Sequence, residues 1–124
     1  MKDCIFCKII NGEIPCKKIY EDNDLLVFLD INPYRPGHTL IIPKKHTLDF
    51  NTIDEETLIK IMRCAKELST KIVTAMNAGG YTLIQNNGIV EEVKHFHLHI
   101  IPKYSEEVNI SIDEAYKKIT EIIK

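Results

Sequence analysis

Residues 95–101 read HFHLHII, with a histidine at every second position. Because successive side chains of a strand point to opposite faces of a sheet, this stretch predicts a strand over 95–104 with two unlike faces. His95, His97 and His99 share one face, and the residues between them are apolar and face a core. Crowded imidazoles disfavour protonation of more than one ring, which leaves the others able to act as nucleophile, base or metal ligand. A solvated face or an adventitious metal patch would account for one histidine, but three in one apolar strand indicate a functional site.

Four further strands and one long helix are predicted from the rest of the chain. Apolar runs separated by turn residues place strands near 17–21, 25–30, 38–43 and 81–87. A helix from about 54 to 77 is predicted by apolar residues spaced three and four apart, namely Leu58, Ile61, Met62, Ala65, Leu68, Ile72 and Met76.

Capping motifs mark the helix ends. Thr52 followed by Glu55 resembles a capping box at the start of the long helix, and residues 77–80 supply its stop. A second box, Ser111 with Glu114, predicts a short C-terminal helix. Strands grouped around one long helix indicate an α+β fold with an antiparallel sheet of about five strands. The length of 124 residues suits a single domain, 1–124.

The composition argues against several classes of protein. Sixteen basic against eighteen acidic residues leave a net charge of −2, which disfavours a nucleic-acid or membrane surface. No apolar run approaches the roughly 18 residues of a spanning helix, and the apolar run at the start is too short for a secretory signal. We therefore expect a cytoplasmic protein with neither a membrane nor a nucleic-acid partner.

The chain has four cysteines, which we interpret separately. Cys4 and Cys7 form a C-x-x-C motif, which suits a metal ion or a redox pair. Disulfides are disfavoured without a secretory signal. Cys16 follows a proline and Cys64 lies on the apolar side of the long helix, so both are interpreted as loop or packing residues without a functional role.

Three motifs together resemble the histidine triad (HIT) family of nucleotide hydrolases and transferases, in particular its Hint branch. HFHLHII resembles the family signature H-φ-H-φ-H-φ-φ, in which φ is apolar. Residues 4–46 resemble the amino-terminal half of the Hint branch, and QNNG at 85–88 occupies the place of its N-x-G motif. The resemblance covers nearly the whole chain and implies one HIT-like domain.

The resemblance implies an enzyme that acts at the α-phosphorus of a nucleotide. His97 matches the histidine that forms a nucleotidyl-histidine intermediate, which water then hydrolyses. His99 would hydrogen-bond the phosphate or assist the leaving group, and His38 matches a fourth active-site histidine. The expected substrates are purine nucleoside phosphoramidates, as for an adenosine 5'-monophosphoramidase. The alternative is a nucleotide-binding regulator or scaffold of the same fold with weak or no catalysis.

The resemblance also implies which residues bind the nucleotide. Asp30 would accept hydrogen bonds from the ribose hydroxyls, with a turn or cap role as the alternative. The apolar residues have ordinary core packing as their alternative. The remaining nucleotide-binding residues are Ile5, Phe6, Phe28, Ile31, Leu40, Val93 and Asn86, the last matched to a polar residue near the leaving group.

A structural zinc ion (Zn2+) and a homodimer are further implications of the resemblance. Some bacterial members of the family hold zinc through four residues that match Cys4, Cys7, His46 and His95. Four such ligands complete a tetrahedral shell and leave no position for a catalytic water. Free thiols at the cysteines and a plain loop role for His46 are the alternative. The dimer would form through the long helix and the strand at 81–87.

One segment departs from the family pattern. The loop at 86–94, NNGIVEEVK, is shorter than usual, and Glu91 and Glu92 stand where glutamine and a hydroxyl residue are expected. Two carboxylates beside a phosphate are electrostatically unfavourable. Either the loop turns them outward, or the enzyme is slow, or it prefers a leaving group that bears an amine or a cation.

Overall fold

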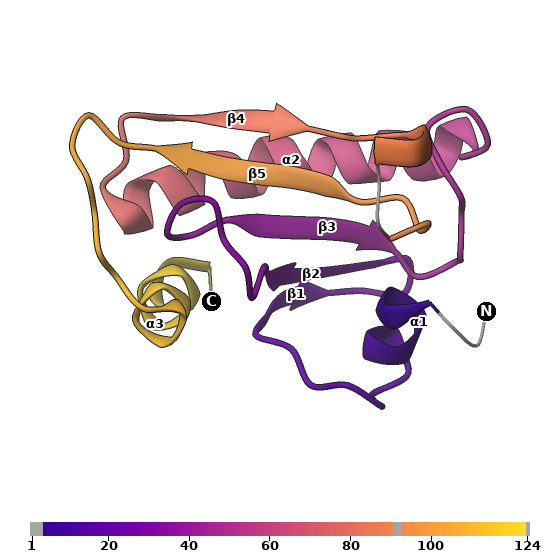
Figure 1. Ribbon diagram of the computed structural model, residues 1–124, viewed down its shortest axis with the longest axis horizontal. Coiled ribbons are helices and arrows are strands. Elements are labelled where there is room, and N and C mark those ends of the chain that lie inside the picture. Colours follow the sequence, from indigo (N-terminus) through magenta and orange to yellow (C-terminus); the bar gives the residue numbers. More distant parts are fainter. Residues whose placement is uncertain (1–3, 91–92, 124) are drawn as a thin grey trace.

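The centre of the molecule is one antiparallel sheet of five strands in the order β1-β2-β3-β5-β4 (Figure 1). The computed structural model describes residues 4–90 and 93–123. The strands are β1 (Lys18–Glu21), β2 (Leu25–Leu29), β3 (Thr39–Pro43), β4 (Gly80–Ile84) and β5 (Leu98–Lys103). The helices are α1 (Ile5–Ile10), α2 (Glu55–Met76) and α3 (Ile112–Ile123), with a 3-10 turn at Gly88–Val90. The predicted α+β fold with one long and one C-terminal helix is confirmed.

The two faces of the sheet are covered differently. Leu25, Val27 and Leu29 of β2 belong to the larger core, which also contains the buried residues of α2 and α3. Leu26 and Phe28 point the other way, into a smaller core that includes Phe6 of α1. Because β2 is buried on both faces, its sequence is a continuous run of apolar residues. In Figure 1, α2 passes behind β4 and β5, while α1 lies near the end of β3.

The histidine-rich strand is shorter than predicted. β5 begins at Leu98, so only His99 of the three histidines lies in a strand. The ladder between β3 and β5 begins at Leu98, opposite Ile41, and Pro43 at the end of β3 has no N–H to extend it. The predicted alternation survives nonetheless, since the apolar residues between and after the histidines are buried in the larger core, namely Phe96, Leu98 and Ile100.

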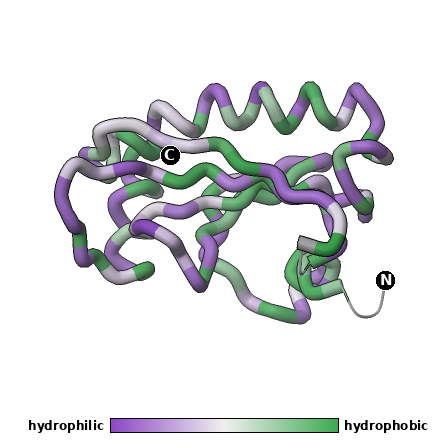
Figure 2. The backbone as a smooth tube through the Cα atoms, turned by 45° about the horizontal axis from the view of Figure 1, so that its top comes forward, coloured by the Kyte–Doolittle hydropathy of each residue, from purple (hydrophilic) through white to green (hydrophobic). Residues whose placement is uncertain are grey.

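Helix α2 differs from the prediction at two positions. Its N-cap is Asp54, whose Oδ2 accepts a hydrogen bond from the backbone N–H of Thr57 at 3.1 Å. Thr52 is therefore not the cap, because its hydroxyl bonds Asp49 instead. Met62 is 37% exposed and does not belong to the buried stripe, although the other predicted positions pack in the core. Figure 2 shows the alternation of hydrophobic and hydrophilic residues along this helix, which ends at Asn77 in the left-handed conformation.

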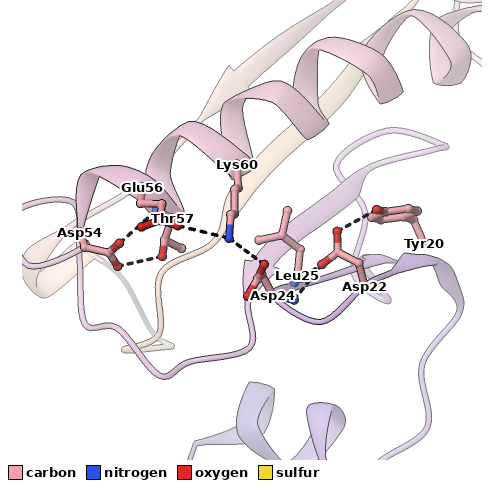
Figure 3. A network of polar contacts seen from close by, with 8 residues as sticks. All are labelled: Tyr20, Asp22, Asp24, Leu25, Asp54, Glu56, Thr57 and Lys60. Atoms are coloured by element: carbon pink, nitrogen blue, oxygen red, sulfur yellow. Dashed lines mark hydrogen bonds and ion pairs between the residues drawn. The ribbon is translucent and has the colours of Figure 1, made fainter.

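A polar network connects the start of α2 to the turn between β1 and β2 (Figure 3). Lys60 Nζ lies 2.8 Å from Asp24 Oδ2. Asp22 Oδ1 accepts hydrogen bonds from the backbone N–H groups of Asp24 and Leu25, and its Oδ2 accepts one from the Tyr20 hydroxyl. Exposed pairs of this kind contribute at most about 1 kcal/mol each, so the network mainly orients the β1–β2 turn against the helix.

The helix near the C-terminus, α3, was predicted from the sequence, whereas the helix near the N-terminus, α1, was not. Ser111 Oγ accepts a hydrogen bond from the Glu114 N–H at the start of α3, which confirms the second capping box. Helix α1 was not predicted because it has only six residues, almost all of them apolar, which are too few to show a helical period. Strand β4 ends at Ile84 rather than 87, because its last pair with β5 joins Ile84 to His99 and β5 itself begins at Leu98. Within the described part of the chain, no helix combines the length and apolar character needed to span a bilayer.

Candidate functional site

A cavity of about 420 Å³, here called the histidine cavity, lies on the sheet face opposite α2. Its volume is in the range of small-molecule sites, about 300–1,000 Å³. Phe28 and Leu40 are core residues and cavity wall at once, whereas Ile31 is 68% exposed at the rim. All the predicted catalytic and nucleotide-binding residues line it, namely His38, His97, His99, Ile5, Phe6, Phe28, Asp30, Ile31, Leu40, Asn86 and Val93.

Several residues that line the histidine cavity were not predicted from the sequence. Asn32 and Tyr34 belong to the turn that precedes His38, and this proximity to a candidate active-site histidine was the signal that could have found them. Tyr34 packs its ring against His38, with centroids 5.3 Å apart. Cys16 also lines the cavity, and burial raises the pKa of its thiol, which fits the packing role expected of it. The other additions are Ile9, Ile14, Pro15 and Leu29.

His97 is held in one tautomer by the backbone. Its Nδ1 lies 2.7 Å from the carbonyl oxygen of His95, and a carbonyl can only accept, so Nδ1 carries the proton. With its single proton on Nδ1, the ring has its lone pair on Nε2. Phe6 packs edge-on against the ring, with centroids 4.9 Å apart. This tautomer and fixed orientation are what a nucleophilic imidazole requires.

A chain of hydrogen bonds sets the tautomers of the other two cavity histidines. The Tyr34 backbone N–H donates to His38 Nδ1 at 3.1 Å, so His38 carries its proton on Nε2 and donates to His99 Nδ1 at 2.9 Å. His99 consequently carries its proton on Nε2. Among the described residues this buried N–H has no hydrogen-bond partner. An unsatisfied buried donor costs about 1–3 kcal/mol, so this N–H is suited to donate to an acceptor in the cavity.

Burial keeps these rings neutral at physiological pH. It lowers the pKa of His99 to about 4, with further lowering by the neighbouring His97 and His38. Burial also lowers the pKa of His38, against the opposing influence of Asp30. Neutral imidazoles can donate and accept hydrogen bonds at once, as the chain through the cavity requires.

Asp30 has the turn role that was the alternative for it, and it also lines the histidine cavity. Oδ1 accepts a hydrogen bond from the Asn32 backbone N–H at 2.9 Å, which is a turn role. Oδ2 lies 3.6 Å from His38 Nε2 at the cavity wall. One oxygen therefore fixes the turn, while the carboxylate as a whole still faces the cavity.

Cys4, Cys7, His46 and His95 form a second group of side chains, here called the metal cluster. Its four donor atoms lie within 4.8 Å of one another. Cys4 Sγ is 3.3 Å from His95 Nδ1, and Cys7 Sγ is 3.3 Å from His46 Nδ1 and 3.6 Å from His95 Nδ1. A tetrahedral zinc ion with ordinary bond lengths separates sulfur from nitrogen by about 3.5 Å. The donor set and its spacing therefore fit zinc.

His95 connects the two groups. Its Nε2 donates to the Pro43 carbonyl at 2.8 Å, which leaves the Nδ1 lone pair directed to the cysteines. This outer hydrogen bond is typical of metal-binding histidines. Burial lowers the pKa of His95 to about 4, so the ring is neutral as a ligand must be. Burial and then contact with Cys4 raise the pKa of Cys7 to about 11, so a nearby cation is needed to hold Cys7 as a thiolate.

The family follows from a direct comparison of the sequence. A family model described as HIT domain matches residues 11–106. The chain belongs to the HIT domain family. The matched range covers all five strands and includes the three cavity histidines, while Cys4 and Cys7 precede it.

Individual HIT relatives resemble most of the chain. An uncharacterized HIT-like protein of Methanocaldococcus jannaschii is 43% identical over 94% of this chain and 98% of its own length. An adenosine 5'-monophosphoramidase of Schizosaccharomyces pombe is 40% identical over 88% of this chain and 80% of its own. A zinc-bound histidine triad protein of Mycobacterium smegmatis superposes with a TM-score of 0.90 at 29% identity, covering 98% of this chain and 94% of that one.

The acidic loop that departs from the HIT pattern is described in part. Asn86 and Val93 at its two ends line the histidine cavity. Asn87 Oδ1 accepts a hydrogen bond from the Phe50 backbone N–H at 2.9 Å, which anchors the start of the loop. Glu91 and Glu92, the two carboxylates of this loop, lie outside the described residues.

The buried His99 predicts a pH-dependent stability for this HIT protein. Its pKa is 6.5 in its unperturbed form and about 4 when folded, so between these values the unfolded chain binds more protons and stability falls as the pH is lowered. From pH 7 to pH 5 the free energy of unfolding should fall by about 2 kcal/mol on account of His99. Urea denaturation of wild type and His99→Gln at both pH values measures this. Equal losses in the two proteins would contradict the assignment.

Proposed function

We propose that this HIT protein hydrolyses purine nucleoside phosphoramidates through a nucleotidyl-histidine intermediate at His97. The observation that carries the proposal is the unsatisfied N–H of His99 beside the His97 ring, with ring centroids 4.9 Å apart. One imidazole offers a lone pair on Nε2 and its neighbour offers a buried donor, which is the pairing that attack on a phosphoryl group needs. The phosphoramidase activity of the S. pombe relative supports the same reaction class.

The cavity walls suit a nucleoside monophosphate. The base would lie on apolar residues such as Phe6, Phe28 and Leu40, which are almost fully buried and therefore rigid. The Asp30 carboxylate would accept hydrogen bonds from the ribose hydroxyls, leaving the α-phosphate beside His97 and His99. Asn86 would face the leaving group.

The reaction would proceed in two displacements. Nε2 of His97 attacks the α-phosphorus, the phosphorus–nitrogen bond to the leaving amine breaks, and that amine takes up a proton from solvent. Water then attacks the phosphorus, the bond to His97 breaks, and a proton returns to solvent as the nucleoside monophosphate forms. The Nε2–H of His99 donates to a phosphoryl oxygen in both steps, and His38 keeps His99 in that tautomer.

The metal cluster would hold a structural zinc ion in this proposal. Cys4, Cys7, His46 and His95 supply four ligands, so zinc would brace the chain without entering the chemistry. Reduced thiols at this site fit the cytoplasm, where we place the protein.

Adenosine 5'-phosphoramidate tests the proposal. The protein should release AMP from it, and acid-free mass spectrometry of a rapidly quenched mixture should find a chain heavier by one adenylyl group at His97. Calorimetry with AMP in parallel distinguishes the alternative, because AMP binding without turnover would indicate a nucleotide-binding regulator instead.

We further propose one domain, 1–124, that forms a homodimer. Ala115 and Ile119 of α3 are buried in the same core as α2, which supports a single domain that includes α3. β4 is an edge strand whose Tyr81 and Leu83 are each 43% exposed. Such an edge offers backbone N–H and C=O groups to a second copy.

Sedimentation velocity tests the dimer. We expect a species of twice the 14.3 kDa chain mass at micromolar concentration. Leu83→Lys should shift it to the monomer, because a charge on this edge opposes pairing, whereas Ile122→Lys on α3 should not. A monomeric wild type would contradict the proposal.

A further inference from the structure

We infer that the metal cluster controls the histidine cavity, so that a bound metal ion and a bound nucleotide raise each other's affinity. The inference rests on the proposed nucleotide and zinc sites and concerns the connection between them. Two structural links carry it, one through helix α1 and one through the backbone of His95.

The first link is α1, which supplies residues to both sites. Phe6 lies between Cys4 and Cys7, and its ring packs against Phe28 at 5.7 Å and His97 at 4.9 Å between centroids. Ile5 on the same helix lines the cavity as well. A helix of six residues is not stable on its own, so its place depends on Phe6 and on what the cysteines bind. A metal ion on the cysteines therefore holds the cavity wall.

The second link is His95, which acts on both sites with different atoms. Its ring nitrogen Nδ1 faces the cysteines, and its carbonyl oxygen accepts the Nδ1–H of His97 at 2.7 Å. Its backbone therefore cannot move without changing the orientation of His97. We assign His95 as a positioning residue, since it would reach the substrate only through His97.

These links predict positive coupling in a stated direction. Without metal, a nucleotide must order α1 and the segment before β5 when it binds, and that ordering lowers its affinity. With metal, the wall is already in place. Coupling of this kind commonly changes affinity about 5- to 150-fold and is reciprocal, so we expect about tenfold for each ligand.

The route to the metal cluster allows a clean measurement. Cys7 and His46 border a separate cavity of about 460 Å³, together with Lys8 and Lys44. A chelator can reach the metal from this side without entering the histidine cavity. A nucleotide that slows metal release would therefore act through the protein, not by blocking the path.

Zinc release from the loaded protein tests the inference without any metal-free sample. A chromophoric chelator should remove zinc about tenfold more slowly in saturating AMP, and adenosine should have a similar effect because the base contacts Phe6 of α1. Equal rates with and without AMP would overturn the inference. An effect of AMP without any effect of adenosine would overturn the link through α1, since the coupling would then involve only the phosphate beside His97.

Calorimetry with AMP supplies the reciprocal measurement. The Kd for AMP should be about tenfold higher in chelator-stripped protein and in Cys7→Ser than in the loaded wild type. Cys64→Ser, a cysteine of α2 outside both sites, should bind AMP as the loaded wild type does. Equal affinities in loaded and stripped protein would overturn the coupling alone. A loaded protein that binds no AMP would overturn the proposed function, and the inference with it.

Discussion

Replacing His97 by alanine is expected to lower the rate of AMP release from adenosine 5'-phosphoramidate at least about 10,000-fold, as for other covalent nucleophiles. The reason is that no other described side chain presents an imidazole lone pair in one fixed tautomer beside the unsatisfied donor of His99. AMP affinity should change little, because the base and ribose contacts remain. Rapid-quench kinetics and calorimetry on the same preparation measure the two effects.

The variant His97→Gly distinguishes loss of the nucleophile from a structural effect of the substitution. His97→Gly leaves space for free imidazole, which should restore part of the rate by attacking the phosphorus in place of the side chain. Thermal unfolding of both variants checks that the Phe6 contact was not essential to the fold. A His97→Ala protein with wild-type turnover would remove His97 from the mechanism.

The turnover rate of His99→Ala should lie between those of the wild type and His97→Ala. The His99 N–H stabilises charge but forms no bond to phosphorus, and the loss of one such donor commonly costs about 100- to 1,000-fold in kcat. The order of the two variants is thus informative by itself, because a nucleophile and a hydrogen-bond donor differ in the size of their effects.

Side-chain periodicity made the sheet and the candidate site predictable. The alternation around HFHLHII separated the apolar residues of the larger core from the cavity histidines. Asp30 directly follows an apolar strand, and a carboxylate in that place needs a hydrogen-bond partner. These features depend on local geometry, since every residue of an extended chain faces one side or the other.

Features set by tertiary contacts were harder to predict. Helix α1 has only six residues and a cysteine at its N-cap, so neither a helical period nor a common capping residue predicts it. Asp54 and Thr52 are both common N-cap residues, so the sequence alone does not choose between them. In the structure Asp54 caps α2, because the Thr52 hydroxyl donates to Asp49 instead. Tyr34 reaches the cavity only because the turn folds back so that its N–H meets His38.

Replacing Gly37 by alanine is expected to cause a large loss of stability. Gly37 is buried at the end of the turn before His38. Its φ is +88°, and an added Cβ would lie 3.0 Å from Met76 Cγ and 3.2 Å from Pro102 Cγ. A left-handed conformation costs a residue with a side chain about 1–2 kcal/mol, and crowding a packed core costs about 1–3 kcal/mol more. Gly37→Ala should therefore lower the free energy of unfolding by about 3 kcal/mol, measured by urea denaturation.

Gly12 is the matched control, because it shares the backbone conformation without the crowding. Its φ is +81°, and an added Cβ would have no atom within 4 Å. Gly12→Ala should cost only about 1 kcal/mol, so the difference between the two variants isolates the contacts with Met76 and Pro102. The Pro102 ring cannot move aside as a flexible side chain can, so the turn itself must shift and carry His38 with it. Gly37→Ala should then lose turnover as well as stability, whereas equal losses of stability in the two variants would show that the core yields at Met76 and leaves His38 in place.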